Sequence, residues 1–114
     1  MKPTAPDLYA SLRRVLDQAY EQASAGKGNE RHANPDERFE DQPIIQIGLN
    51  LGSNHFEIGQ AVKKAIESAR LPPDRAVAEL LGAINYLAAA VLVRSALVCE
   101  PAPDPRLRER ERAR

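Results

Sequence analysis

The sequence has few aromatic residues and almost no cysteine. Among 114 residues it contains no tryptophan, three tyrosines, two phenylalanines and one cysteine. The single cysteine, Cys99, excludes an internal disulfide and any metal site built from several cysteines, and it suits a reducing compartment. Because aromatic residues make up only 4% of the chain, each of them is informative about packing or binding.

The chain also has no excess charge of either sign. Sixteen lysines and arginines are balanced by 16 aspartates and glutamates, so the formal net charge is zero. A protein that binds duplex nucleic acid normally has a high isoelectric point or a basic stripe. We therefore expect no duplex nucleic acid partner.

Long apolar runs are missing as well. The apolar stretch 80–93, between Glu79 and Arg94, has 14 residues without a charge, whereas roughly 20 are needed to span a bilayer. The N-terminal stretch MKPTAPDLYASLRRV lacks the apolar core of a signal peptide. These features predict a soluble, cytoplasmic protein with no membrane partner. Its length predicts one small domain, which gains stability from self-association.

Helical spacing of apolar residues is the main feature that is present. Asp7 can cap a first helix, which Gly26 and Gly28 end. Its apolar positions follow the helical period: Leu8, Leu12, Val15, Leu16, Ala19 and Ala23. The stretch PIIQIGLNLG, residues 43–52, predicts a short helix, although its isoleucines also suit a strand.

The second half of the chain predicts an antiparallel helical hairpin, residues 54–70 and 74–98, joined at LPPDR. Ser53 or Asn54 can cap the first of these helices, with Glu57 completing a capping box. Its expected buried face comprises Phe56, Gly59, Val62, Ala65 or Ile66, and Ala69, with Lys63, Lys64 and Glu67 outside. The expected core stripe of the last helix comprises Val77, Leu80, Leu81, Ile84, Leu87, Ala88, Val91 and Leu92.

A second stripe of the last helix consists of small residues: Ala78, Gly82, Asn85 and Ala89. Such a face lets another backbone approach closely, and a helix that is apolar on most sides must be buried on most sides. The first helix could supply the cover within the chain. The alternative, which we adopt as the prediction, is an interface of a homo-oligomer. We thus expect an all-α fold, a small helical bundle that is oligomeric.

The division of the chain follows from these patterns. We interpret residues 1–99 as a single helical domain with an internal polar loop, 24–43. Residues 100–114 alternate in charge after several prolines, and we expect this tail to be disordered.

The polar loop contains the candidate ligand-binding residues. Gly26-Lys27-Gly28 is not a P-loop, because it lacks a preceding strand, an upstream glycine and a following serine or threonine. Its glycines can nevertheless let backbone N–H groups converge on an anion. The candidate ligand-binding residues are Tyr9, Lys27, Arg31, His32 and Lys64. The simpler interpretation is a helix-ending glycine followed by a solvated loop.

Catalytic and metal-binding patterns are not recognisable. The two histidines, His32 and His55, do not share a helical face with carboxylates at a ligand spacing. No nucleophile is paired with a base at a recognisable spacing. We therefore predict no enzymatic activity, no metal and no cofactor.

Two family resemblances bear on function. The segment AVAELLGAINYLAAAVL resembles the metal-binding helix of MazG-like nucleotide pyrophosphohydrolases, and Glu79 and Gly82 match it. Leu80 and Ala83 stand where the second acid and the aspartate of that family belong. Magnesium needs several oxygen ligands, so this resemblance implies a catalytically degenerate relative.

The second resemblance covers residues 35–93. This segment resembles the helical-hairpin sponge proteins of phages, of the anti-CBASS and anti-Thoeris type. The matching features are PDERFEDQP before a hairpin, the turn PPDR, and Asn85 with the alanine run 88–90. The tryptophan of such hairpins is absent here. This resemblance implies a homo-oligomer, in the host cytoplasm if phage-encoded, that sequesters an anionic cyclic nucleotide without chemistry. A scaffold protein that acts through the acidic segment 36–41 is the alternative.

Overall fold

The computed structural model describes residues 6–25 and 37–98, and within these residues all regular elements are helices and none is a strand. The elements in chain order are α1 (Ala10–Ala25), the 3-10 helix η1 (Phe39–Asp41), α3 (Pro43–Leu51), α4 (His55–Ser68) and α5 (Pro73–Val98). The predicted all-α class is confirmed. The stretch that begins at Pro43 is a helix, so the strand alternative is wrong.

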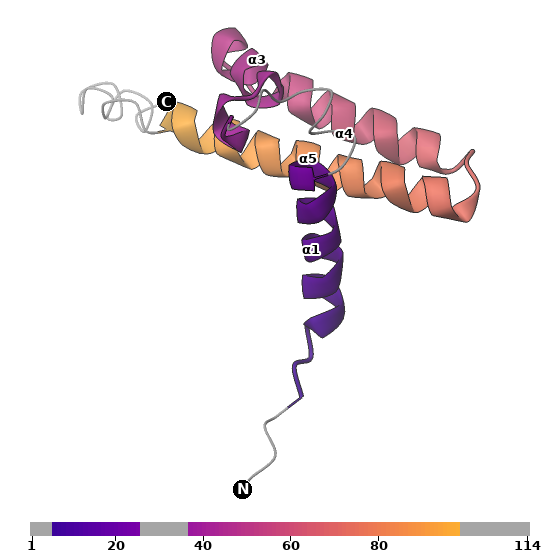
Figure 1. Cartoon of the computed structure of the whole chain (residues 1–114). Coiled ribbons are helices and arrows are strands. Elements are labelled where there is room, and N and C mark those ends of the chain that lie inside the picture. Colours follow the sequence, from indigo (N-terminus) through magenta and orange to yellow (C-terminus); the bar gives the residue numbers. More distant parts are fainter. Residues whose placement is uncertain (1–5, 26–36, 99–114) are drawn as a thin grey trace, which may run out of the picture.

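The last two helices of the described chain form the predicted antiparallel hairpin. Helices α4 and α5 lie side by side and are joined at the LPPDR turn, with Pro73 as the first residue of α5 (Figure 1). Helix α3 covers the end of the hairpin opposite this turn. Helix α1 touches the middle of α5 with its C-terminal end and projects away from the hairpin, which gives the described chain a T shape (Figure 1).

Local signals in the sequence explain where the helices begin and end. The Asp7 carboxylate accepts a hydrogen bond from the Tyr9 N–H at 2.9 Å, as expected of a residue that caps the first helix. Helix α3 ends at Gly52, whose φ of 71° is in the left-handed region that glycine adopts without strain. The predicted capping box of α4 is wrong, because Asn54 makes no side-chain cap bond there and instead donates to the Ala90 carbonyl.

The faces that the hairpin helices bury differ from those predicted. On α4 the buried residues are Glu57 and Ala61, while Val62 and Ile66 are exposed. On α5 small residues and one valine are buried, namely Gly82, Ala83, Ala89, Ala90 and Val93. The expected core stripe of α5 is largely exposed in the single chain: Val77, Leu80, Leu87, Ala88, Val91 and Leu92. Small residues at the contact let two helix backbones approach closely, and the larger apolar residues then face outward.

The buried core is correspondingly small. Ile45 of α3 packs with Ala89 and Val93 of α5, and four partly buried residues surround them: Phe39, Ile44, Leu49 and Leu97. The core therefore lies where η1 and α3 cover the C-terminal half of α5.

Two hydrogen bonds attach α1 to α5. The Gln22 amide donates to the Ala78 carbonyl at 3.3 Å, and the Asn85 amide donates to the Ala19 carbonyl at 3.0 Å. Of the predicted apolar stripe of α1, only Ala19 is buried. Ala23 is half-buried beside α5, whereas Leu8, Leu12, Val15 and Leu16 project beyond α5 and are exposed in the single chain.

We expect Asn85→Ala to lower the free energy of unfolding by about 1 kcal/mol, because it removes a partly buried hydrogen bond between α1 and α5. Chemical denaturation followed by circular dichroism measures this change. Asn50→Ala is the matched control, since Asn50 is exposed on α3 and should leave the stability unchanged. Equal effects of the two substitutions would contradict the prediction.

Helix α5 is also long and apolar enough, over Pro73–Leu97, to cross a membrane by length and composition alone. The uncharged stretch 80–93 is shorter than this helix because Glu79 and Arg94 interrupt the apolar run, whereas the helix continues past both residues. Core helices of water-soluble proteins meet the same criteria, so this single helix is weak evidence. The expectation of no membrane partner stays a prediction.

Candidate functional site

A pocket of mixed character lies where α1, α3, α4 and α5 meet. Its volume is about 520 Å³, within the range of about 300–1,000 Å³ that small-molecule sites occupy. Aromatic and aliphatic walls come from Phe39, Ile44, Ile47, Phe56 and Tyr86, and polar groups come from Gln22, Gln42, Lys64, Glu79 and Asn85. Such a lining of apolar walls with a few polar groups is typical of a site that orients a small ligand.

Lys64 supplies the positive charge of this pocket. Its ammonium nitrogen lies 3.5 Å from Oε2 of Glu79 and 5.9 Å from the centre of the Tyr86 ring. The sequence analysis placed Lys64 on the outside of α4, but its side chain is largely buried against α5, and that expectation is wrong. Gly82 makes the position possible, because a Cβ atom there would lie 3.2 Å from Cδ of Lys64.

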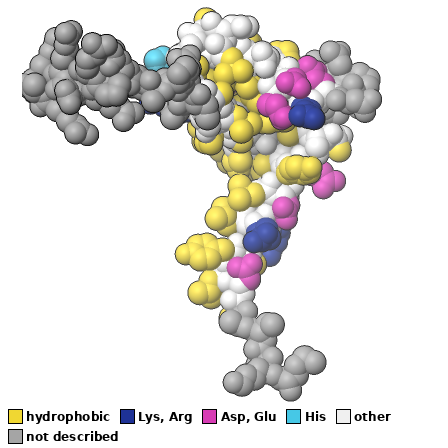
Figure 2. Space-filling model, turned by 90° about the vertical axis from the view of Figure 1, so that its left-hand side faces the viewer, with side chains coloured by type: hydrophobic (Ala, Val, Ile, Leu, Met, Phe, Trp, Pro, Cys, Tyr) yellow, Lys and Arg dark blue, Asp and Glu magenta, His cyan; other side chains and the backbone are white. Residues whose placement is uncertain are grey.

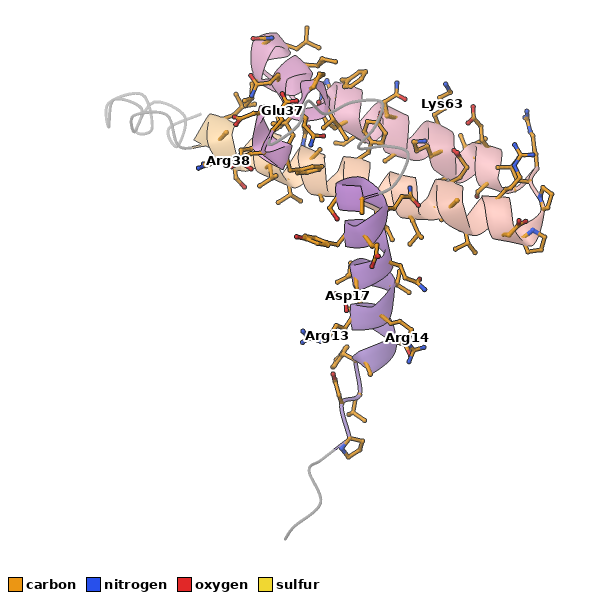
Figure 3. The ribbon with its side chains drawn as sticks, in the orientation of Figure 1. Arg13, Arg14, Asp17, Glu37, Arg38 and Lys63 are labelled. Atoms are coloured by element: carbon orange, nitrogen blue, oxygen red, sulfur yellow. The ribbon has the colours of Figure 1, made fainter. Side chains whose placement is uncertain are left out.

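Lys63, the preceding residue, has a different environment. Its side chain is 64% exposed and pairs with Glu67 one turn later at 3.9 Å. Figure 3 shows Lys63 on the side of α4 that points away from α5. Two adjacent lysines thus have opposite roles, and only Lys64 reaches the pocket.

Tyr86 and Phe56 form the aromatic wall. Their ring centres lie 6.5 Å apart with an interplanar angle of 77°, the edge-to-face arrangement that aromatic pairs favour. Burial raises the pKa of the Tyr86 hydroxyl, and the negative charge of Glu57 raises it further. The hydroxyl therefore stays protonated at neutral pH and can donate a hydrogen bond to an anionic ligand.

The structure separates the predicted ligand-binding residues. Lys64 lines the pocket, whereas Tyr9 precedes the first residue of α1, 13 residues from Gln22. That separation amounts to about 20 Å of helix, so Tyr9 and Lys64 of one chain do not meet at one ligand. Lys27, Arg31 and His32 lie outside the described residues, and their predicted contribution stays a prediction.

The small-residue stripe of α5 is covered from within the chain. Gly82 and Ala89 are buried, Asn85 is bonded to α1, and the exposed Ala78 accepts the hydrogen bond from Gln22. This is the arrangement in which the first helix supplies the cover. A subunit interface built on Gly82 and Ala89 would require α1, α3 and α4 to move away.

The remaining polar groups do not form a metal site in the described part of the chain. No three histidine, cysteine, aspartate or glutamate side chains come together within residues 6–25 and 37–98. Glu79, the residue that matches the MazG-like pattern, faces Lys64. Within η1 and its flanks, Glu40 pairs with Arg38 at 3.8 Å, and Phe39 packs against the core.

No model of a known protein family, no curated protein and no solved structure matches this chain. The resemblances to phage sponge proteins and to MazG-like enzymes therefore gain no support from these comparisons. What can be said about function depends on the geometry of the pocket.

Sequence reasoning missed the aromatic wall and the pairing of Lys64 with Glu79. Phe56 was expected in the hairpin core, and Glu79 was considered only as a remnant of a metal site. One signal is present in the sequence: Lys64 has a long side chain and Gly82 has none, so the two can pack against each other across two helices. This pairing can be recognised only when the register of α4 on α5 is known.

Proposed function

We propose that this protein binds an anionic nucleotide without chemical conversion, in the pocket around Lys64. The observation that supports the proposal is a half-buried ammonium group beside an aromatic wall, in a pocket of nucleotide size. A phosphate oxygen would accept from Lys64, and a base would stack on the wall that includes Phe56. Stacking on an aromatic side chain contributes about 1–3 kcal/mol per base.

The polar groups around this wall fit the edge of a base. Amide side chains of Gln22, Gln42 and Asn85 line the pocket, and amides offer both a donor and an acceptor. The pocket would therefore recognise the base and the phosphate together. Sequestration of a cyclic nucleotide signal, as implied by the resemblance to phage sponge proteins, is the specific form of this proposal.

Glu79 would compete with the ligand. Its carboxylate holds the Lys64 ammonium at 3.5 Å, so a bound phosphate must share or replace that contact. Removing the carboxylate frees the ammonium for the ligand. The proposal therefore predicts opposite effects for the two partners of one ion pair.

Thermal shift and calorimetric titration against cyclic di- and trinucleotides, ADP-ribose and nucleoside triphosphates test the proposal. We expect at least one of these to raise the melting temperature. Lys64→Ala should weaken its binding at least about tenfold, the loss of one charge-assisted hydrogen bond of about 1.5–3 kcal/mol. Glu79→Gln should strengthen binding, and Lys63→Ala, the matched control with an exposed lysine, should leave it unchanged.

Several outcomes would contradict the proposal. If no nucleotide shifts the wild-type protein, a protein partner reached through the acidic segment 36–41 becomes the better hypothesis. Loss of binding in Glu79→Gln together with magnesium-dependent pyrophosphate release would instead favour the MazG-like alternative. In the same titration, the Lys27→Ala variant tests whether the glycine-rich loop contributes to ligand binding as predicted.

A further inference from the structure

An exposed apolar surface forms a concave corner between α1 and the C-terminal half of α5. We define this corner by its lining: Leu16 and Tyr20 of α1, and Ile84, Ala88, Val91 and Leu92 of α5. It encloses about 730 Å³. Figure 2 looks onto this side of the molecule and shows apolar side chains that run along α1 and continue over the hairpin.

The apolar face of α1 extends the corner outward. Nine large apolar residues on α1, on the turn before it and on this half of α5 are between 39% and 85% exposed: Leu8, Tyr9, Leu12, Val15, Leu16, Tyr20, Leu87, Val91 and Leu92. A large side chain has on the order of 150–250 Å² of accessible surface. With about half of that exposed on average, the nine residues together present roughly 1,000 Å² of mainly apolar surface. A stable interface needs about 800 Å² from each partner, and a typical monomer has no patch above about 600 Å².

The two parts of this surface complement each other in shape. The corner is concave, and the N-terminal end of α1 is a projecting apolar tip that carries Leu8 and Tyr9 (Figure 1). A chain with one apolar recess and one apolar projection can pair with a second copy so that each projection enters the other recess. A twofold axis satisfies both contacts at once.

The charged residues of α1 lie on the side of the helix away from its apolar stripe. At 3.6 residues per turn, Leu12, Val15 and Ala19 share one face of the helix. The other side carries the charged residues Arg13, Arg14, Asp17 and Glu21, and Figure 3 shows the two arginines extending from α1. The apolar face can therefore pack against a second copy without burying a charged side chain of its own.

We propose that the occupant of the corner is a second copy of this chain. The α1 helices pair in antiparallel orientation, and Leu8 and Tyr9 of each copy enter the corner of the other. This surface is distinct from the small-residue stripe that the sequence analysis proposed for self-association. It does not depend on nucleotide binding at Lys64, and each proposal can fail without the other.

Sedimentation equilibrium of the full chain at micromolar concentration tests the proposal. We expect a dimer, and we expect Leu12→Glu combined with Leu16→Glu to raise its dissociation constant at least about 30-fold. Val62→Glu combined with Ile66→Glu is the matched control, because these α4 residues are similarly exposed but lie outside the corner. The control should remain dimeric, and circular dichroism checks that each variant keeps its helix content.

Substitutions at the tip of α1 test the orientation. Leu8→Glu combined with Tyr9→Glu should raise the dissociation constant at least about 30-fold, because both side chains enter the corner of the other copy in this pairing. A monomeric wild-type chain would overturn the proposal, and would leave the corner to a different partner. A dimer insensitive to the α1 variants or to the tip variant, or equally sensitive to the α4 control, would also overturn it.

Discussion

Glu57→Met is expected to raise the free energy of unfolding by about 2 kcal/mol or more. Glu57 is fully buried between α3, α4 and α5, and neither carboxylate oxygen has a hydrogen-bond partner among the described residues. A carboxyl group buried without a hydrogen-bond partner loses its hydration and gains little in return. Methionine has a similar volume and no charge, so it keeps the packing and removes the cost.

Urea denaturation at neutral pH measures the effect of Glu57→Met. The matched control is Glu67→Met on the same helix, because Glu67 is about half exposed and pairs only with Lys63. A surface substitution of this kind changes stability by less than about 0.5 kcal/mol. If Glu57→Met destabilises the protein instead, the carboxylate has a stabilising partner, and a bound ligand or second chain is the place to look for it.

Gly48→Ala is expected to lower the free energy of unfolding by about 1–3 kcal/mol, the usual cost of overfilling a well-packed site. A Cβ atom at this position would lie 2.5 Å from Oε1 of Glu57 and 2.9 Å from its Cδ atom. Because Glu57 is fully buried, its carboxylate has no open space into which it can move. The Glu57 carboxyl group therefore occupies the space that a side chain at position 48 would fill.

A double-mutant cycle isolates this contact. In a Glu57→Ala background the same Gly48→Ala substitution should cost little, because the obstructing carboxylate is gone. Gly59→Ala is the control glycine, since it lies on the exposed side of α4 and a Cβ there meets nothing within 4 Å. It should stabilise the helix by up to about 1 kcal/mol. Equal costs of Gly48→Ala in both backgrounds would contradict the contact.

These two residues show how the hairpin differs from a conventional helical pair. The contact between α3, α4 and α5 contains Glu57, Gly48 and several alanines beside Ile45 and Val93, while Val62, Leu80 and Leu87 lie outside. A larger side chain at the contact would separate the helices and open the Lys64 pocket. The same packing that forms the pocket also leaves the exposed apolar surface that, in our proposal, a second copy covers.

The sequence by itself determined the helices and their ends. Asp7, Gly52 and Pro73 act through the backbone geometry of neighbouring residues, and such local effects do not depend on the rest of the fold. The same holds for the all-α class and for the LPPDR turn. These features were predictable because each depends on a few consecutive residues.

Only the tertiary structure decided which face of each helix is buried. Helix α5 carries apolar residues around most of its circumference, so periodicity alone could not choose between its large-residue stripe and the stripe of small residues that includes Gly82. The choice depends on how closely α1, α3 and α4 approach α5, which no local pattern specifies. That choice also turned Lys64 inward beside Tyr86, and it left Leu12 and Leu16 exposed on a projecting arm.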